Sequence, residues 1–144
     1  AQSNRERYEG FCQALADAGK KVDSSLCLTT PLGIDTYREE IDTFLSSLSR
    51  MPDAFVCASD YVACILMQLL EKRGLRVPED VAVSGFDNNT EDLLAEHLTT
   101  VQVFNEELGA RLALQILYRI KYPNTPHEIT YLGTNVLYRD STGD

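Results

Sequence analysis

The sequence lacks the patterns that mark membrane proteins, zinc proteins and common phosphate-binding enzymes. No apolar run approaches the roughly 18 residues that cross a bilayer, and the opening AQSNRERYEG has no apolar signal-peptide core. The four cysteines are scattered without a C-x-x-C pair, and neither G-x-x-x-x-G-K-[ST] nor G-x-G-x-x-G occurs. We therefore expect no membrane contact, no metal ion and no cofactor. The cysteines are interpreted as reduced core thiols of a cytoplasmic protein.

Basic residues and histidines are also scarce. The 144 residues carry 13 Lys and Arg against 22 Asp and Glu, which gives a net charge of −9. Because DNA binding depends on cations that neutralise phosphates, this chain itself is not expected to bind DNA. The two histidines, His97 and His127, lie in polar segments without a nucleophile motif, which argues against an enzyme. Hydrophobic residues at 44% and charged residues at 24% are typical of one globular domain.

Apolar periodicity predicts an α/β fold. Helical spacing favours four helices, at 4–19, 35–48, 61–73 and 105–121, with one or two helical turns within 89–97. Extended segments are predicted at 22–28, 54–58, 81–86, 98–101, 128–132 and 135–138. The runs at 54–58 and 81–86 are continuously apolar, as in parallel strands buried on both faces. The alternation of strands and helices predicts a mostly parallel sheet flanked by helices.

Two acidic residues follow the buried strands. Asp60 follows the first and Asp87 follows the second, and ligands of such sheets bind at the carboxyl ends of the strands. A carboxylate there can accept hydrogen bonds from adjacent hydroxyls of a sugar or nucleoside. The same residues could instead cap the helices that follow them, or hold a divalent metal ion in a phosphotransfer enzyme.

Two arginines, Arg5 and Arg7, lie in the first predicted helical turn, where the helix dipole disfavours cations. One of them could reach across the strand ends and bind a ligand oxygen with its guanidinium group, and the alternative is a solvated surface arginine. The predicted helix 61–73 is apolar on more than one face. It could form part of the core or of a dimer interface, and the candidate interface residues are Val62, Ile65, Leu66 and Leu69.

Motifs along nearly the whole chain resemble the lactose/galactose-repressor (LacI/GalR) family of transcriptional regulators. The matching segments are, in chain order, RYEGF at 7–11, PDAF at 52–55, GLRVPEDVAVSGFD at 74–87, LTTV at 98–101 and RDST at 139–142. The third segment is very similar to the family pattern G-x-x-V-P-x-D-V-x-V-x-G-[FY]-D. The resemblance implies a type I periplasmic-binding-protein-like fold, in which two α/β lobes clasp a small effector, a sugar or a purine, and control a helix-turn-helix headpiece.

The resemblance also implies site residues. Arg7 and Asp87 match family positions that contact the effector, and we expect their side chains to converge at the ligand-facing edge of the sheet. Ser59 and Asp60 match positions that line the cleft, and Asn105 matches a position that approaches it. The helix 61–73 is similar to the element through which family members form homodimers.

The domain organisation follows from the same resemblance. Residues 1–102 are expected to form the C-terminal lobe of the effector-binding domain, incomplete at its N-terminus. Residues 103–127 are expected to form a crossover helix that packs on the first lobe in relatives, and residues 128–144 to form closing strands. The chain is therefore interpreted as a fragment of a bacterial regulator that would reach DNA only through a missing headpiece. The alternatives are a sugar-binding component of a transport system and the metal-dependent phosphotransfer enzyme.

Overall fold

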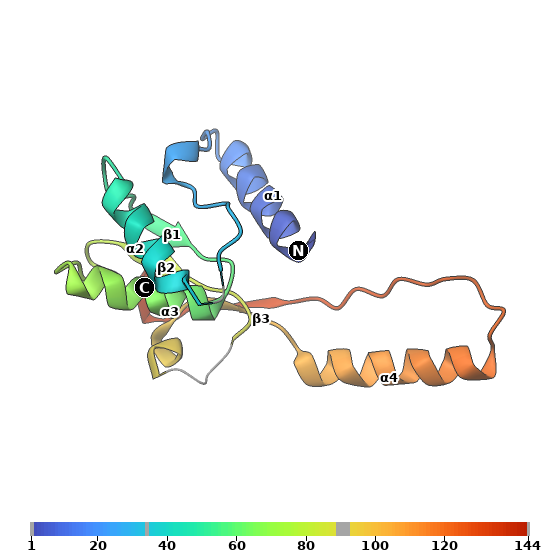
Figure 1. Ribbon diagram of the computed structural model, residues 1–144. Helices are drawn as coiled ribbons and strands as arrows, with labels where there is room; N and C mark the ends of the chain where they lie inside the picture. Colours follow the sequence, from blue (N-terminus) through green and yellow to red (C-terminus); the bar gives the residue numbers. More distant parts are fainter. Residues whose placement is uncertain (1, 34, 89–92, 144) are drawn as a thin grey trace.

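The computed structural model describes residues 2–33, 35–88 and 93–143 (Figure 1). The helices are α1 (Gln2–Asp17), α2 (Tyr37–Ser47), α3 (Asp60–Lys72) and α4 (Asn105–Lys121). The strands are β1 (Ala54–Val56), β2 (Ala82–Ser84), β3 (Thr100–Gln102) and β4 (Asn135–Leu137). Three short 3-10 helices are η1 (Ser24–Leu26), η2 (Leu93–His97) and η3 (Asp140–Thr142).

The strands form a mostly parallel arrangement, as predicted. β1 pairs with β2 in parallel, with Phe55 opposite Val83. Two isolated parallel bridges, Ser84 with Thr99 and Asp87 with Gln102, join β2 to the strand segment of β3. β4 pairs with β3 in the antiparallel sense. The carboxyl ends of β1, β2 and β3 consequently meet at one edge, which is where the candidate ligand-binding residues follow the strands.

The core lies between α2, α3 and the strands. α3 contributes most of the buried side chains, and Leu70 from α3, Val83 from β2 and Leu98 before β3 are fully covered. α2 contributes Ile41 and Leu45 to the same cluster. Each large aliphatic side chain buried in this way stabilises the fold by about 1.5–3 kcal/mol.

This packing bears on the candidate dimer residues. Ile65, Leu66 and Leu69 belong to the core of this chain, with 7%, 4% and 4% of their surface exposed, and Val62 is half-buried against them. They have almost no surface left to offer a second copy. The core interpretation of the helix accounts for these residues, and homodimerisation through α3 stays a prediction.

Two predicted strands are absent from the described secondary structure. Instead of a strand at 22–28, the chain forms η1, whose N-cap Asp23 accepts hydrogen bonds from the Ser25 backbone N–H at 3.0 Å and hydroxyl at 2.6 Å. These local side-chain bonds compete with a strand ladder, and the structure records no strand that pairs with this segment. Residues 128–132 likewise run without ladder partners beside α4, and pairing begins at Asn135. The prediction of a strand was wrong at 22–28, whereas residues 128–132 are extended, as predicted, but form no ladder.

None of the four cysteines forms a disulfide, as predicted, and Cys64 is the one that is fully buried. The others, Cys12, Cys27 and Cys57, are half-buried. Burial raises the pKa of the Cys57 thiol to about 12, so this thiol stays protonated at neutral pH.

The α4 helix projects from the α/β body, and residues 122–134 return alongside it as an extended segment (Figure 1). None of its residues is buried, and large apolar side chains such as Leu112, Leu117 and Ile120 are 61%, 63% and 73% exposed. The total accessible surface is 10339 Å², whereas a compact protein of 16.1 kDa exposes roughly 7,400 Å². The projecting arm, α4 with residues 122–134, therefore exposes apolar surface of the kind that proteins bury against a partner.

Gly85 offers a sharp test of the packing at the strand ends. A Cβ at this position would meet the Asp60 carboxylate at 2.2 Å and Leu98 Cδ2 at 2.8 Å. Because both neighbours are buried, Gly85→Ala is expected to lower the free energy of unfolding by about 3 kcal/mol. Gly10→Ala is the matched control, since a Cβ there meets no atom within 4 Å and alanine favours the helix. Urea denaturation of both variants measures the difference, and equal stability of the two would contradict this packing.

Candidate functional site

The loops that follow β1 and β2 are held together at the carboxyl edge of the sheet. The Cys57 N–H donates to the Ser84 carbonyl at 2.8 Å, and the Asp60 N–H donates to the Phe86 carbonyl at 2.8 Å. The Asp87 N–H then donates to the Val101 carbonyl at 2.9 Å. These bonds extend the strand pairing beyond β1 and β2 and fix the position of residues 86–88, which we call the binding turn.

Arg7 reaches the binding turn from α1. Its Nη1 donates a hydrogen bond to the Ala58 carbonyl, and its Nη2 lies 3.4 Å from Asp87 Oδ1. The guanidinium carbon lies 3.6 Å from the centre of the Phe86 ring, a cation–π contact. The Arg7 and Asp87 side chains are 27% and 42% exposed, so solvent and ligands can reach both. The predicted convergence of Arg7 and Asp87 at this edge is therefore observed.

The binding turn has an uncommon backbone. Asp87 and Asn88 have φ angles of 109° and 55°, in the region that glycine favours. Aspartate and asparagine tolerate positive φ better than other non-glycine residues. The conformation directs the Asp87 carboxylate toward Arg7 at the edge of the sheet.

The surroundings of Asp87 shift the pKa of its carboxyl group in two opposite directions. Burial raises its pKa above the ordinary value, and the charge of Asp60 raises it further. The Arg7 guanidinium lowers the pKa of Asp87 through its charge and its hydrogen bond, but the net direction is upward. A ligand that donates hydrogen bonds to the ionised carboxylate would relieve this cost.

Ser59 and Asp60 have different roles at the start of α3. Ser59 is the N-cap, and its hydroxyl accepts a hydrogen bond from the Val62 N–H at 3.4 Å. This corrects the alternative in which Asp60 caps the helix. Asp60 is 2% exposed, and its Oδ1 accepts a hydrogen bond from the Thr100 hydroxyl at 2.6 Å. Its carboxylate thus joins the end of β1 to β3, and effector contact by Ser59 or Asp60 stays a prediction.

The other sequence-derived candidates lie apart from this cluster. Asn105 is exposed as the first residue of α4, where its N–H donates to the Val103 carbonyl at 3.1 Å. Arg5 is exposed on α1, consistent with the solvated alternative. A binding role for Asn105 stays a prediction.

Sequence reasoning missed two residues of the site. Phe86 supports the guanidinium group of Arg7, and Arg139 donates from Nη2 to Asn88 Oδ1 at 2.8 Å. Both lie inside matched motifs, Phe86 before Asp87 and Arg139 at the start of RDST. The motif positions were the available signal, but no spacing rule places residue 139 beside residue 88.

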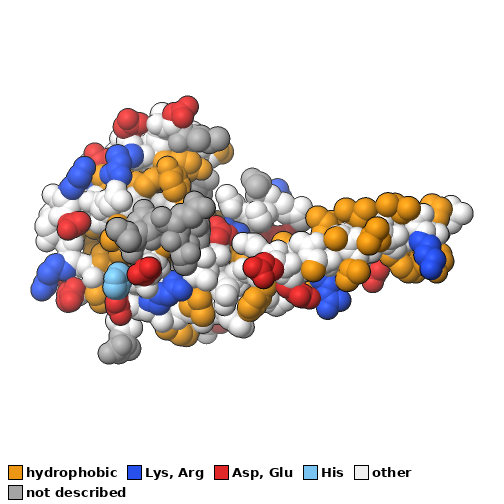
Figure 2. All heavy atoms as spheres, turned by 90° about the horizontal axis from the view of Figure 1, so that it is seen from below, with side chains coloured by type: hydrophobic (Ala, Val, Ile, Leu, Met, Phe, Trp, Pro, Cys, Tyr) orange, Lys and Arg blue, Asp and Glu red, His pale blue; other side chains and the backbone are white. Residues whose placement is uncertain are grey.

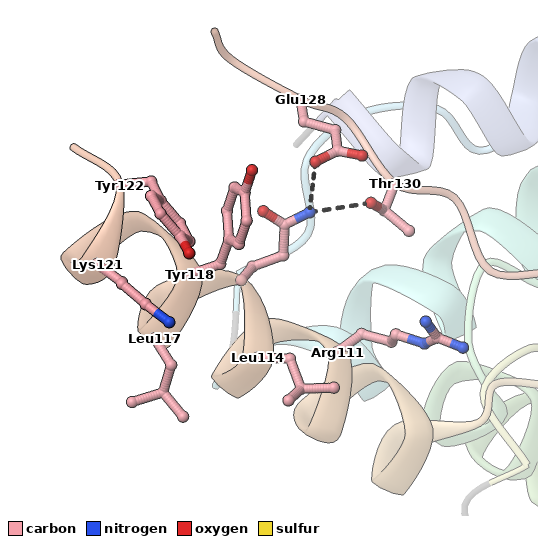
Figure 3. A pocket seen from close by; sticks show the side chains of 9 residues that line it. Arg111, Leu114, Leu117, Tyr118, Lys121, Tyr122, Glu128 and Thr130 are labelled. Atoms are coloured by element: carbon pink, nitrogen blue, oxygen red, sulfur yellow. Dashed lines mark hydrogen bonds between the residues drawn. The ribbon is translucent and has the colours of Figure 1, made fainter. Parts of the chain in front are cut away.

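A shallow hollow lies on the projecting arm (Figure 3). It is an open groove between α4 and the returning segment, with Tyr118 and Tyr122 at one end and Arg111 at the other. The Gln115 amide donates to Thr130 Oγ1 at 3.2 Å across it. Figure 2 shows hydrophobic side chains along the whole arm. The exposed apolar side chains beside this groove are of the kind that proteins bury against a partner.

Two further observations concern the described residues only. No described helix has the length and hydropathy needed to cross a membrane. In the same part of the chain, no group of three or more His, Cys, Asp and Glu side chains is arranged to hold a metal ion.

Comparison with known proteins defines the class. Residues 1–142 match the family model of a periplasmic binding protein-like domain. The transcriptional regulator CelR of Thermobifida fusca is 34% identical over 142 residues, covering 94% of this chain and 40% of that protein. The repressor PurR of Photobacterium profundum is 30% identical over 142 residues, covering 97% of this chain and 42% of that protein.

Solved structures agree. A LacI-family regulator from Sanguibacter keddieii has a TM-score of 0.83 and 30% identity, covering 96% of this chain and 52% of that one. A CelR–cellobiose complex has a TM-score of 0.83 and 31% identity, and the match covers 94% of this chain and 42% of that one. The chain therefore belongs to the family of periplasmic-binding-protein-like domains that LacI-family transcriptional regulators carry. It spans about two-fifths of the length of the curated relatives CelR and PurR. These relatives are regulators and not enzymes, which fits the expectation of a non-enzyme.

The raised pKa of Asp87 gives a stability prediction. The folded chain binds this proton more tightly than the unfolded chain, so stability falls as pH rises from the ordinary value of 3.8 through the raised pKa. At neutral pH, Asp87→Asn removes the cost of keeping a partly buried carboxylate ionised. Asparagine also tolerates positive φ, so the substitution should raise the Tm by about one degree. The gain should vanish below the ordinary pKa. Thermal unfolding monitored by circular dichroism across pH measures it, and a lower Tm at neutral pH would contradict the argument.

Proposed function

We propose that this chain forms the C-terminal lobe of the effector-binding domain of a LacI-family transcriptional regulator. Its ligand is a small polyhydroxyl effector, a sugar or nucleoside, bound at the edge of the sheet. The observation that carries the proposal is the Arg7–Asp87 pair, 3.4 Å apart at the carboxyl ends of parallel strands. The domain's effector occupancy then controls a DNA-binding headpiece elsewhere in the regulator.

The chemistry of the pair suits hydroxyl recognition. The Asp87 carboxylate offers acceptors, and the Arg7 guanidinium offers donors in a fixed plane. Together they match vicinal hydroxyls, each of which donates one hydrogen bond and accepts another. The Phe86 ring and the Ala58 carbonyl already hold Arg7 in place, so little side-chain entropy is lost on binding.

The projecting arm supports the domain organisation. The accessible surface exceeds that of a compact chain of this mass by roughly 2,900 Å², and the exposed apolar side chains of the arm contribute to this excess. An interdomain surface within one chain typically buries about 600–1,500 Å². We therefore assign residues 103–127 to packing on the first lobe of the same domain, and residues 128–144 to the segment that returns along the arm and closes the second lobe formed by residues 1–102.

The site is tested with sugars and nucleosides on the chain itself. One lobe supplies one wall of a cleft, so affinity should be in the millimolar range, which NMR chemical-shift titration can follow. Cellobiose, other mono- and disaccharides, purine bases and nucleosides form the panel. At least one is expected to shift the amide signals of Phe86 and Asp87.

Arg7→Ala should abolish these shifts, because hydrogen bonds to charged groups contribute about 1.5–3 kcal/mol each. Arg5→Ala is the matched control, since Arg5 is exposed on the same helix. Shifts that persist unchanged in Arg7→Ala would place the ligand elsewhere and overturn the proposed site.

The exposed apolar face of the arm leads to a separate prediction, which concerns self-association of the chain. In a solution of residues 1–144 alone, this apolar face should drive self-association that increases with concentration, because leaving each aliphatic side chain in water forgoes about 1.5–3 kcal/mol. Leu112→Glu combined with Leu117→Glu should restore the monomer without loss of stability, because both side chains are exposed. Light scattering after gel filtration measures this, and a monodisperse monomer of the unsubstituted chain would count against the assignment.

A further inference from the structure

The last described residues of the chain are inserted among the strands at the site. The Ser141 hydroxyl donates to the Val83 carbonyl of β2 at 2.6 Å and accepts from the Thr99 N–H at 2.8 Å. One buried hydroxyl thus bridges β2 and the start of β3. We call residues 139–142 the closing segment, and its hydrogen bonds to Val83 and Thr99 fix its position against the strands.

Arg139 is held on both its backbone and its side chain. The Thr99 hydroxyl accepts from the Arg139 N–H at 2.8 Å and donates to the Arg139 carbonyl at 3.0 Å. Its Nη1 donates to the carbonyls of Ala95 and Leu98, at 3.1 and 3.0 Å. These bonds orient the guanidinium group so that Nη2 donates to Asn88 Oδ1 at 2.8 Å.

Asn88 is the residue next to the ligand-binding candidate Asp87. Its N–H donates to the Thr100 hydroxyl at 3.3 Å, and that hydroxyl in turn donates to buried Asp60. The side chain and the backbone of Asn88 are therefore both held, by Arg139 on one side and by Thr100 on the other. Because Asp87 and Asn88 both have positive φ, this turn needs such restraints to persist.

We propose that Arg139 is a positioning residue for the Asp87 carboxylate. It acts through Asn88: the Arg139–Asn88 hydrogen bond holds the binding turn in its left-handed conformation, and that conformation directs Asp87 toward Arg7 and the effector. The proposal rests on the proposed function for its biological meaning. Its physical content concerns the orientation of Asp87 and can be tested without a ligand.

The variants separate the side-chain contact from the backbone requirement. Asn88→Gly removes the acceptor but suits positive φ, so a turn that depends on backbone preference alone would be unharmed. Asn88→Asp keeps an acceptor for Arg139 and tolerates the same φ. Arg139→Gln removes the forked donor from the other side. If Arg139→Gln fails to fold, the two Asn88 variants still decide the question.

The readout is NMR of the unliganded chain at neutral pH. The three-bond HN–Hα couplings of residues 87 and 88 report φ, and the Asp87 carboxyl signal reports its contact with Arg7. We expect Asn88→Gly and Arg139→Gln to average both couplings and to move the carboxyl signal toward that of a solvated aspartate. We expect Asn88→Asp to keep the native couplings. Native couplings and carboxyl signal in both Asn88→Gly and Arg139→Gln, with only a loss in urea stability, would overturn the proposal.

Cellobiose, the sugar named for the CelR complex, serves as the probe in a second arm. If the unsubstituted chain binds it, Asn88→Gly and Arg139→Gln should weaken binding about tenfold, whereas Asn88→Asp should retain it. Affinity unchanged in the first two variants would overturn the positioning role. If cellobiose and the rest of the panel do not bind the unsubstituted chain, the proposed function fails, and the couplings still decide whether Arg139 orients Asp87.

Discussion

The arrangement of the site depends on one buried hydrogen bond, from the Thr100 hydroxyl to the Asp60 carboxylate. It ties the start of α3, directly after β1, to β3 on the far side of β2. Only glycine fits at position 85 between them, because a Cβ there would overlap the carboxylate. Burying a carboxylate is costly unless it is well paired, so the strand ends are fixed where this pairing is satisfied. The binding turn, Arg7 and the closing segment are all placed relative to that fixed edge.

Much of the fold could be predicted from periodicity, and the misses share one cause. The helices α2 and α3 and the strands β1 and β2 follow apolar spacing that the core satisfies, and α4 follows helical spacing although its apolar side chains are exposed. The segment 22–28 has a strand-like composition but no strand beside it, and a strand exists only through the ladder it forms with a neighbour. A single sequence does not state which neighbour is available. Local hydrogen bonds from Asp23 therefore decided the structure of this segment.

The site was predictable to a different degree. Arg7 and Asp87 were reached through an anomalous charge at a helix start and a carboxylate at a strand end, and motif resemblance strengthened both. The contacts of Phe86 with Arg7 and of Arg139 with Asn88 join residues that lie 79 and 51 positions apart, and no local pattern encodes them. The burial of Asp60 was likewise invisible, because a strand-end aspartate can face either solvent or the sheet.

The separation of Arg7 from Asp87 along the chain, 80 positions, has a kinetic consequence. Contacts between such distant residues pay a large loop-closure entropy and tend to form after local structure. The Arg7–Asp87 contact therefore forms only once α1 has docked against the strand ends, and a partly folded chain lacks it. An effector of the proposed kind would bind only those molecules in which α1 has docked, and it would raise their stability with the logarithm of its concentration.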